Sequence, residues 1–255
     1  MLRFAALGSG SRGNALLVQG GSTHILIDCG FSRRECERRL AQLGCGLDQL
    51  SAVVVTHEHA DHVSGAAAVA RASGAPLWLS EGTRAALGSA LDAIDCHCFS
   101  SHEPFAVEAL RVSPFPVPHD AREPCQLRVD DGSRSIGVLT DAGHVSRAMT
   151  EALTGVGALF LECNHDEELL RTGSYPPSLK ARVGGPYGHL SNREAAALLK
   201  AIGTDGMQHL MAGHLSEQNN TPGHARSALA AAADCDPQWI RIASQGEVLD
   251  WCEIR

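Results

Sequence analysis

The run "VVVTHEHADHVSG" places four side chains of metal-ligand type within six residues: His57, His59, Asp61 and His62. Alternate residues of an extended chain project to the same side, so His57 and His59 can bind one ion. A helix that begins just after them would turn Asp61 and His62 toward a second ion. Alone, each histidine would be explained as a surface residue and Asp61 as a helix N-cap. Together, directly after an apolar run, they predict a metal site.

A second concentrated group, Cys96 to Cys98 around His97, is interpreted as structural, because neighbouring side chains of a strand point to opposite faces. The nine cysteines are odd in number and scattered, so we expect reduced thiols.

The N-terminal segment "MLRFAALGSGSRGN" carries Gly8, Gly10 and Gly13 at the G-x-G-x-x-G spacing of dinucleotide-binding loops. That motif needs a helix directly after the glycines, whose N-terminus binds the pyrophosphate. Two strand-like runs separated by Gly20 and Gly21 follow instead, which is a hairpin pattern. We therefore expect no nucleotide cofactor. We expect the glycines to form a tight loop near the predicted metal site. This loop either contacts substrate phosphate or is a plain structural turn.

The elements that position these residues alternate between strands and helices. Apolar runs predict strands at 51–56, 76–80, 157–163 and 208–213, several short strands between 94 and 140, and two β-type runs at the C-terminal end. Helical patterns cover 32–43, 62–73, 83–91, 146–153, 191–202 and 223–233. The fold class is therefore α/β or α+β, with sheets covered by helices.

Length and composition favour one large domain over residues 1–255, with 44% hydrophobic and 20% charged residues. No apolar run approaches the roughly 20 residues that cross a membrane, and the N-terminal segment lacks signal-peptide features. We expect a cytoplasmic protein without membrane contact. The sequence leaves the oligomeric state open, a homodimer included.

The net charge of −8 argues against a protein that binds along nucleic acid without regard to sequence, because such binding depends on neutralising phosphates with basic residues. A local basic patch remains compatible with it. Basic residues gather at 33–39, where a solvated helix face is the simpler interpretation. They gather again at 171–193, where a solvated face and a basic patch explain the pattern equally well.

The H-x-H-x-D-H run, Asp28 after an earlier strand and later isolated ligands resemble the metallo-β-lactamase superfamily across nearly the whole chain. The isolated ligands, each at the end of a predicted strand and in the order of that family, are His119 in "FPVPHDA", Asp141 in "GVLTDAGH" and His214 in "MAGHLSEQNN". Within it, "GSGSRGN", "LECNHDEELLR", "SYPPSLKARV", "GHLSN" and "HLSEQNN" resemble the YycJ/WalJ branch. The resemblance implies an αββα sandwich of two mixed β-sheets flanked by helices. It also implies 5′-to-3′ exonuclease activity on DNA.

The resemblance further implies two divalent metal ions at one edge of the sandwich. One would be held by His57, His59 and His119, the other by Asp61, His62 and His214, with Asp141 bridging them. Asp28 would orient ligands without being one. Imidazole and carboxylate sites accept Zn, Mn or Fe, so the metal is open. Lactamases place a cysteine in the second site, but Cys163 lies in a predicted strand, where a buried thiol is the simpler role.

The acid for the leaving group is expected from "GHLSN". Ser191 and Glu194 there form a capping-box pattern, which explains the serine but not His189. Related tRNA-processing nucleases pair a comparable histidine with an acidic residue, and Glu162 resembles that partner. We predict His189 as general acid, oriented by Glu162, and Asp61 as a further catalytic residue. A histidine that is merely hydrogen-bonded in a loop is the alternative.

Polar residues near these motifs are candidates for contacts with substrate. Tyr175 and Arg182 join Lys180 as an aromatic and basic set suited to a nucleic-acid end. The substrate-binding candidates are Ser9, Ser11, Asn14, His165, Lys180, Ser216, Asn219 and Asn220. For most of them a turn, a helix cap or a solvated face would explain the residue equally well.

The leading hypothesis is a dinuclear metal-dependent phosphodiesterase or nuclease, and specifically a 5′-to-3′ DNA exonuclease with a metal-bridging hydroxide as nucleophile. A small-molecule phosphodiesterase acting on a cyclic phosphate or nucleotide is the first alternative, favoured by the acidic charge and the shortage of lysine. A glyoxalase II-like thioesterase is the second alternative. A non-catalytic metal- or nucleic-acid-binding module would not need the complete ligand set.

Overall fold

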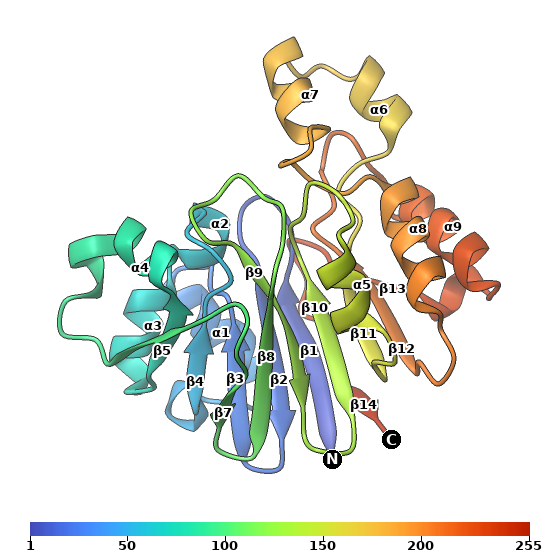
Figure 1. Ribbon diagram of the computed structural model, residues 1–255. Helices are drawn as coiled ribbons and strands as arrows, with labels where there is room; N and C mark the ends of the chain where they lie inside the picture. Colours follow the sequence, from blue (N-terminus) through green and yellow to red (C-terminus); the bar gives the residue numbers. More distant parts are fainter.

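Two seven-stranded β-sheets pack face to face in the computed structural model, which describes residues 1–255 (Figure 1). The first sheet has the order β14-β1-β2-β3-β4-β5-β6. Its strands are β1 (Leu2–Gly8), β2 (Ala15–Gly20), β3 (Thr23–Ile27), β4 (Ala52–Val54), β5 (Leu77–Ser80), β6 (Cys96–Phe99) and β14 (Cys252–Ile254). The hairpin expected at Gly20 and Gly21 is the β2–β3 turn, and β3 to β6 run parallel.

The second sheet has the order β13-β12-β11-β10-β9-β8-β7. Its strands are β7 (Phe105–Val107), β8 (Leu110–Pro116), β9 (Cys125–Asp130), β10 (Ser135–Leu139), β11 (Ala158–Glu162), β12 (His209–Gly213) and β13 (Arg241–Ile242). Strands β7 to β10 are antiparallel and β10 to β13 are parallel, so both sheets are mixed.

The helices are α1 (Arg33–Gln42), α2 (Ala60–Val63), α3 (Ala66–Ser73), α4 (Glu81–Leu87), α5 (Arg147–Leu153), α6 (Glu167–Thr172), α7 (Pro177–Val183), α8 (Asn192–Ile202) and α9 (Pro222–Ala233). Most of them cover the outer faces of the two sheets, whereas α6 and α7 lie beyond the ends of the strands (Figure 1). Short 3₁₀ turns lie at Leu47–Gln49, Gly88–Leu91 and Pro237–Trp239. None of these helices has the length and apolar character of a membrane span. The predicted αββα sandwich is confirmed.

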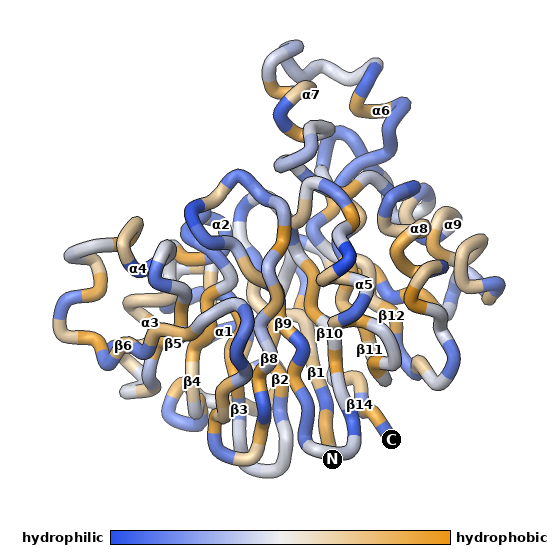
Figure 2. The backbone as a smooth tube through the Cα atoms, in the orientation of Figure 1, coloured by the Kyte–Doolittle hydropathy of each residue, from blue (hydrophilic) through white to orange (hydrophobic).

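Three apolar clusters hold the layers together. The inter-sheet core contains 24 buried residues, among them Phe4, Val54 and Phe160. A second cluster lies between the second sheet and helices α5, α8 and α9, and a third lies under α1 and α3. Figure 2 shows hydrophobic strands below and largely hydrophilic loops at their upper ends. The core therefore fixes the strands and leaves polar loops free to carry a site.

Three local expectations differ from the structure. The helix expected over 62–73 is two helices, because Gly65 passes so close to the Phe31 carbonyl that an added Cβ would lie 1.8 Å from its oxygen. Helix α6 was not expected, although Asp166 caps it by accepting hydrogen bonds from Glu168 N and Leu169 N. Arg39 is buried under the β1–β2 loop and does not lie on a solvated face.

Candidate metal centre

The predicted ligands meet where four strands end, at the upper edge in Figure 1. The "THEHADH" run follows β4, His119 follows β8, Asp141 follows β10 and His214 follows β12. The inter-sheet core brings these four loops to the same edge of the sandwich. Residues 153 positions apart in sequence thereby become neighbours, with His214 Nε2 3.2 Å from Asp61 Oδ2.

His57, His59 and His119 form the first group, and their ligand atoms could hold one ion. The His119 Nε2 and His59 Nδ1 atoms are 3.2 Å apart. His119 Nδ1 lies 2.9 Å from the Gly188 carbonyl oxygen, which only accepts, so Nδ1 donates and Nε2 presents its lone pair to the group. Burial lowers the pKa of both His57 and His119, which favours the neutral ring that binds metal.

An orphaned atom tests whether this group fits a metal. His57 is fully buried, and its Nε2 has no hydrogen-bond partner. Its Nδ1 lies 3.0 Å from the Thr56 hydroxyl. A buried ring nitrogen without a partner is costly unless something else binds it. The first group therefore fits a divalent cation.

Asp61, His62 and His214 form the second group. The Asp61 Oδ2 atom lies 3.4 Å from His62 Nε2 as well as 3.2 Å from His214 Nε2. The Nδ1 atoms of the two histidines point away from Asp61. His62 Nδ1 lies 2.8 Å from Asp28 Oδ2, and His214 Nδ1 lies 3.0 Å from the Thr140 carbonyl oxygen. Each outer acceptor fixes a tautomer that leaves Nε2 free for an ion.

Asp141 lies between the two groups. Its Oδ2 is 2.9 Å from His62 Nε2, and its Oδ1 is 2.9 Å from His214 Nδ1. Both oxygens are buried, yet neither accepts a hydrogen bond of normal geometry. Burial alone would lower the pKa of His62, but Asp141 and Asp28 raise it well above its usual value. This part of the site is thus electrostatically suited to positive charge, which a proton or a metal ion can supply.

Asp28 has the position expected of an orienting residue. Besides His62, its carboxylate accepts hydrogen bonds from the Thr56 amide at 2.8 Å and the Thr56 hydroxyl at 2.9 Å. Its backbone is left-handed, with φ 58°, and His214 is left-handed too, with φ 53°. Such conformations are costly for residues with side chains and cluster at functional sites. We infer that the fold sustains them to aim these two side chains.

His189 and Glu162 are in direct contact, as the sequence predicts. The His189 Nδ1 atom lies 2.8 Å from Glu162 Oε1 and 3.1 Å from Asp141 Oδ1. Burial would lower the pKa of His189, but the two carboxylates raise it to about 9. Because Nδ1 faces these acids, Nε2 is the ring nitrogen left to meet a substrate. His189 also lines a cavity of about 310 Å³ at the metal centre.

Of the eight substrate-binding candidates, Ser11 alone lines this cavity. Ser9 and Asn14 are buried behind it: Ser9 Oγ donates to Asn14 Oδ1 at 2.9 Å and accepts from the His214 amide at 2.8 Å. Asn14 Nδ2 reaches Asp61 Oδ2 at 3.2 Å. Residues 8–14, the glycine loop, therefore hold residues of the candidate metal centre in position through Ser9 and Asn14. An added Cβ at Gly8 would lie 2.3 Å from Arg39 Nη1, so this packing requires glycine.

The other five candidates lie outside the cavity lining. His165, Ser216, Asn219 and Asn220 are buried, and Asn220 Nδ2 donates to the Cys163 carbonyl at 2.7 Å. Ser9, Ser216 and Asn220 also line a neighbouring cavity of about 360 Å³. Lys180 Nζ donates to the Arg171 carbonyl. Contact between any of these residues and a substrate stays a prediction.

Two polar residues of the cavity, Asp120 and Asn164, were missed by sequence reasoning. The Asp120 carbonyl oxygen is 3.2 Å from His59 Nε2, and its Oδ1 is 3.6 Å from His119 Nε2. Its Oδ2 accepts a 2.6 Å hydrogen bond from Arg182 Nε on α7. Adjacency to His119 in "PHDA" was the available signal. Arg182 and Tyr175, both noticed in the sequence, do line the cavity.

The cysteines take no part in this site. Cys163 is buried, and burial raises the pKa of its thiol. His97 stacks on Trp78 with ring centroids 4.6 Å apart, away from the metal-ligand groups.

The fold and this cluster define a class of protein. A family model described as "Beta-lactamase superfamily domain" matches residues 23–214, which include every predicted ligand, and the chain belongs to this superfamily. It is 34% identical over 232 residues to the exodeoxyribonuclease YycJ of Bacillus anthracis, covering 90% of this chain and 88% of that protein. It is 33% identical over 224 residues to the exodeoxyribonuclease WalJ of Streptococcus pneumoniae, covering 86% and 83%.

Solved structures show the same fold. The metallo-β-lactamase fold protein YhfI from Bacillus subtilis superposes with a TM-score of 0.76 at 17% identity, covering 98% of this chain and 100% of that one. The prediction of an enzyme, a metal-dependent hydrolase of the phosphodiesterase and nuclease type, is confirmed by the relatives.

Proposed function

We propose that this chain is a 5′-to-3′ DNA exonuclease that uses two divalent metal ions. The observation that carries the proposal is the cluster of five histidines and two aspartates around buried, unpartnered ligand atoms, in a chain that aligns over 90% of its length with an exodeoxyribonuclease. One ion would be held by His57, His59 and His119. The other would be held by Asp61, His62 and His214. Asp141 would contribute to both sites. Zn, Mn and Fe suit this ligand set.

The chain's own residues divide the remaining work. When bound, the two ions supply Lewis-acid polarisation of the phosphodiester and neutralise its charge. His189 donates a proton from Nε2 to the departing oxygen of the nucleotide. Glu162 holds the opposite ring nitrogen at 2.8 Å and so keeps Nε2 directed at the cavity. Arg182 and Tyr175 receive the strand end beside the metal centre.

The first experiment tests activity and polarity together. The purified protein, supplied with Mn²⁺ or Zn²⁺, is incubated with 5′-phosphorylated single-stranded and duplex DNA and with matching RNA, labelled at either end. We expect mononucleotides released from the 5′ end of DNA. His102→Ala removes an exposed histidine outside the site and serves as the control variant. Release of nucleotides from the 3′ end would contradict the proposed 5′-to-3′ polarity. If no nucleotides are released from any DNA, the proposed nuclease activity is wrong.

A small-molecule phosphodiesterase is the second candidate. The net charge of −8 and the cavity of about 310 Å³ favour a compact substrate. Comparing kcat/KM for a cyclic nucleotide with kcat/KM for DNA ends separates the two candidates. The nuclease proposal requires the DNA value to be the larger.

A further inference from the structure

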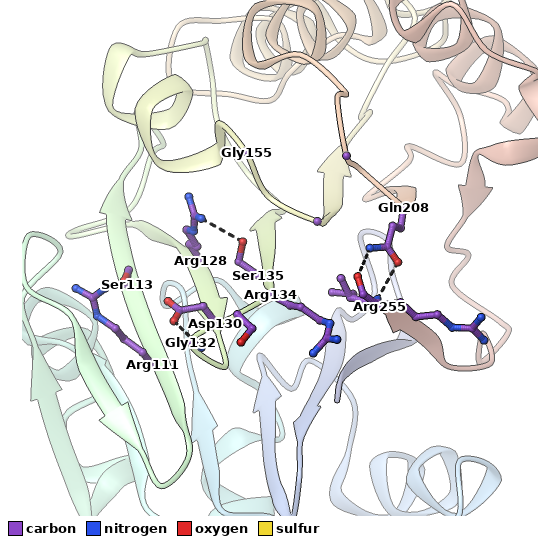
Figure 3. A pocket seen from close by; sticks show the side chains of 14 residues that line it. Arg111, Ser113, Arg128, Asp130, Gly132, Arg134, Ser135, Gly155, Gln208 and Arg255 are labelled. Atoms are coloured by element: carbon purple, nitrogen blue, oxygen red, sulfur yellow. Dashed lines mark hydrogen bonds between the residues drawn. The ribbon is translucent and has the colours of Figure 1, made fainter.

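A basin of about 590 Å³ lies at the end of the second sheet opposite the metal centre (Figure 3). Ser135 begins β10 and Gln208 directly precedes β12, whereas Asp141 and His214 follow those same strands. At about 3.3 Å per residue, the five residues of β10 place the basin about 17 Å from the metal centre. The two cavities share no lining residue. The basin is therefore a separate feature.

The basin concentrates positive charge in an acidic chain. Its lining includes four arginines, Arg111, Arg128, Arg134 and Arg255, and a single acidic side chain, Asp130. The chain as a whole carries a net charge of −8. One lining residue of the 14 is hydrophobic and none is aromatic. Such a surface offers charge and hydrogen bonds, but no aromatic ring on which a nucleobase could stack.

Arg128 is held in place without being neutralised. Its Nη1 donates to the Ala152 and Thr154 carbonyls, both at 3.2 Å. Its Nη2 donates to the Ser135 hydroxyl at 3.1 Å, a bond that Figure 3 shows. These acceptors carry no charge, and Arg128 makes no ion pair. A positive charge that is already fixed loses little side-chain entropy when an anion binds.

Arg134 lines the same basin and forms no close ion pair. Its Nε atom is buried and has no hydrogen-bond partner, and its nearest carboxylate oxygen, on Asp131, is 3.9 Å from Nη1. On the facing side Gln208 holds the backbone of Arg255, accepting from its amide at 2.8 Å (Figure 3). The Arg255 guanidinium lies 4.0 Å from Glu253. Both arginines thus retain free donors.

We propose that this basin binds a compact, multiply charged phosphate anion of the inorganic oligophosphate class. Guanidinium groups match phosphate oxygens with paired N–H donors, and the serine hydroxyls of the lining add further donors. The absence of an aromatic surface favours free phosphate chains over nucleotides or single-stranded DNA. The proposal does not depend on the nuclease activity proposed above.

Site-resolved NMR titration of the ¹⁵N-labelled, metal-loaded protein with inorganic triphosphate tests this. Gly132, Gly155 and Gly206 line the basin, and Gly188 lines the metal-centre cavity, so their amide signals report on each site separately. We expect saturable shifts at the three basin glycines. Arg134→Gln should weaken this binding at least tenfold, and Arg134→Lys should weaken it less. Arg33→Gln, which removes an exposed arginine on α1, should leave it unchanged.

Four outcomes would overturn the proposal. Shifts confined to Gly188 would show that triphosphate binds at the metal centre alone. Equal affinity in Arg134→Gln and the unaltered protein would show that the basin arginines do not hold the anion, and Arg111→Gln provides a second variant should Arg134→Gln fail to fold. Equal affinity for sulfate would overturn the oligophosphate class. Basin shifts with a DNA oligonucleotide but not with triphosphate would assign the basin to nucleic acid.

Discussion

At the scale of single residues, hydrogen-bond acceptors on the outer side of the histidine rings set the orientation of the candidate metal ligands. The rings of His119, His62 and His214 each direct Nδ1 at an acceptor: the Gly188 carbonyl, the Asp28 carboxylate and the Thr140 carbonyl. These contacts fix which nitrogen is free. They also explain why Asp28 is buried without being among the candidate ligands. The ligand atoms are thus oriented before any ion binds.

Replacing a proposed metal ligand and replacing the proposed general acid should separate metal binding from catalysis. We expect His57→Ala to lose metal and activity together, because it removes the ligand atom that has no other partner. His189→Ala should retain metal and reduce kcat by about 10²- to 10⁴-fold, the usual contribution of a general acid. Metal content and single-turnover rates measure the two effects. Equal metal loss in both variants would contradict the role proposed for His189.

At the scale of elements, α7 is tied to the candidate metal centre by an ion pair and by a hydrogen bond from the His189 amide to the Val183 carbonyl. Arg182 on α7 donates to Asp120, whose other atoms face His59 and His119. Figure 1 shows α6 and α7 projecting beyond the ends of the strands, on the side of the metal centre. This lobe, residues 166–184, is therefore placed to meet substrate as it approaches the cavity.

Arg182→Gln should weaken substrate binding more than chemistry. We expect KM for DNA ends to rise about fivefold to tenfold, the cost of one solvent-exposed hydrogen bond of about 1 to 1.4 kcal/mol, with kcat nearly unchanged. Steady-state kinetics and metal analysis provide the measurement. Arg171→Gln, an exposed arginine on α6 paired with Glu168, is the matched control. A fall in metal content would instead assign Arg182 a role in assembling the centre.

Helix α1 anchors the glycine loop through Arg39. Its Nη1 donates to the Leu7 carbonyl at 2.6 Å, and its Nε donates to Glu35 at 2.7 Å. Hydrogen bonds from Arg38 and then Arg39 lower the pKa of Glu35 from its usual 4.5 to about 2. A carboxylate with a lowered pKa stabilises the fold above pH 4.5, and this contribution is lost as the pH falls toward 2.

Glu35→Gln should therefore destabilise the protein at pH 7 by about 1 kcal/mol, a modest figure because the carboxylate is partly exposed. The difference from the unaltered protein should shrink between pH 4.5 and pH 2. Urea unfolding at several pH values measures it. Glu37→Gln, whose carboxylate is 4.0 Å from Arg33 and exposed, should change little. A difference that stays constant with pH would contradict the assignment to this ion pair.

At the scale of the whole molecule, the metal centre joins the two sheets. His57 to His62 follow the first sheet, and His119, Asp141 and His214 follow the second. Ions held between these loops bind the native state and not the unfolded chain, so they should add to the free energy of unfolding.

Removing the metal should lower the melting temperature. At an ion concentration of 100 times Kd, the expected loss is about 2.7 kcal/mol, and readdition of Zn²⁺ or Mn²⁺ should restore the stability. Calorimetry before and after chelation, with metal analysis of the same samples, measures this. Asp141→Asn should abolish the response to readded metal. An unchanged melting temperature in protein proven to be metal-free would show that the centre does not couple the sheets.

The sequence alone determined most strands and helices and the run of candidate metal ligands from His57 to His62. Local periodicity and turn residues predict strands and helices because they depend on near neighbours, and His57 to Asp61 are brought together by the geometry of one short loop. The pairing of His189 with Glu162 was predicted from a family resemblance, and the two side chains are in contact.

Tertiary structure alone decided which residues face the cavity. His165, Asn219 and Asn220 look like surface ligands in sequence but are buried, because the loops after β11 and β12 pack against each other. Asp120 faces the metal centre because β8 ends beside the loop after β4. The basin is lined by arginines from distant parts of the chain, with Arg111 on one side and Arg255 on the other (Figure 3). Burial and charge convergence depend on contacts distant in sequence, which no local pattern records.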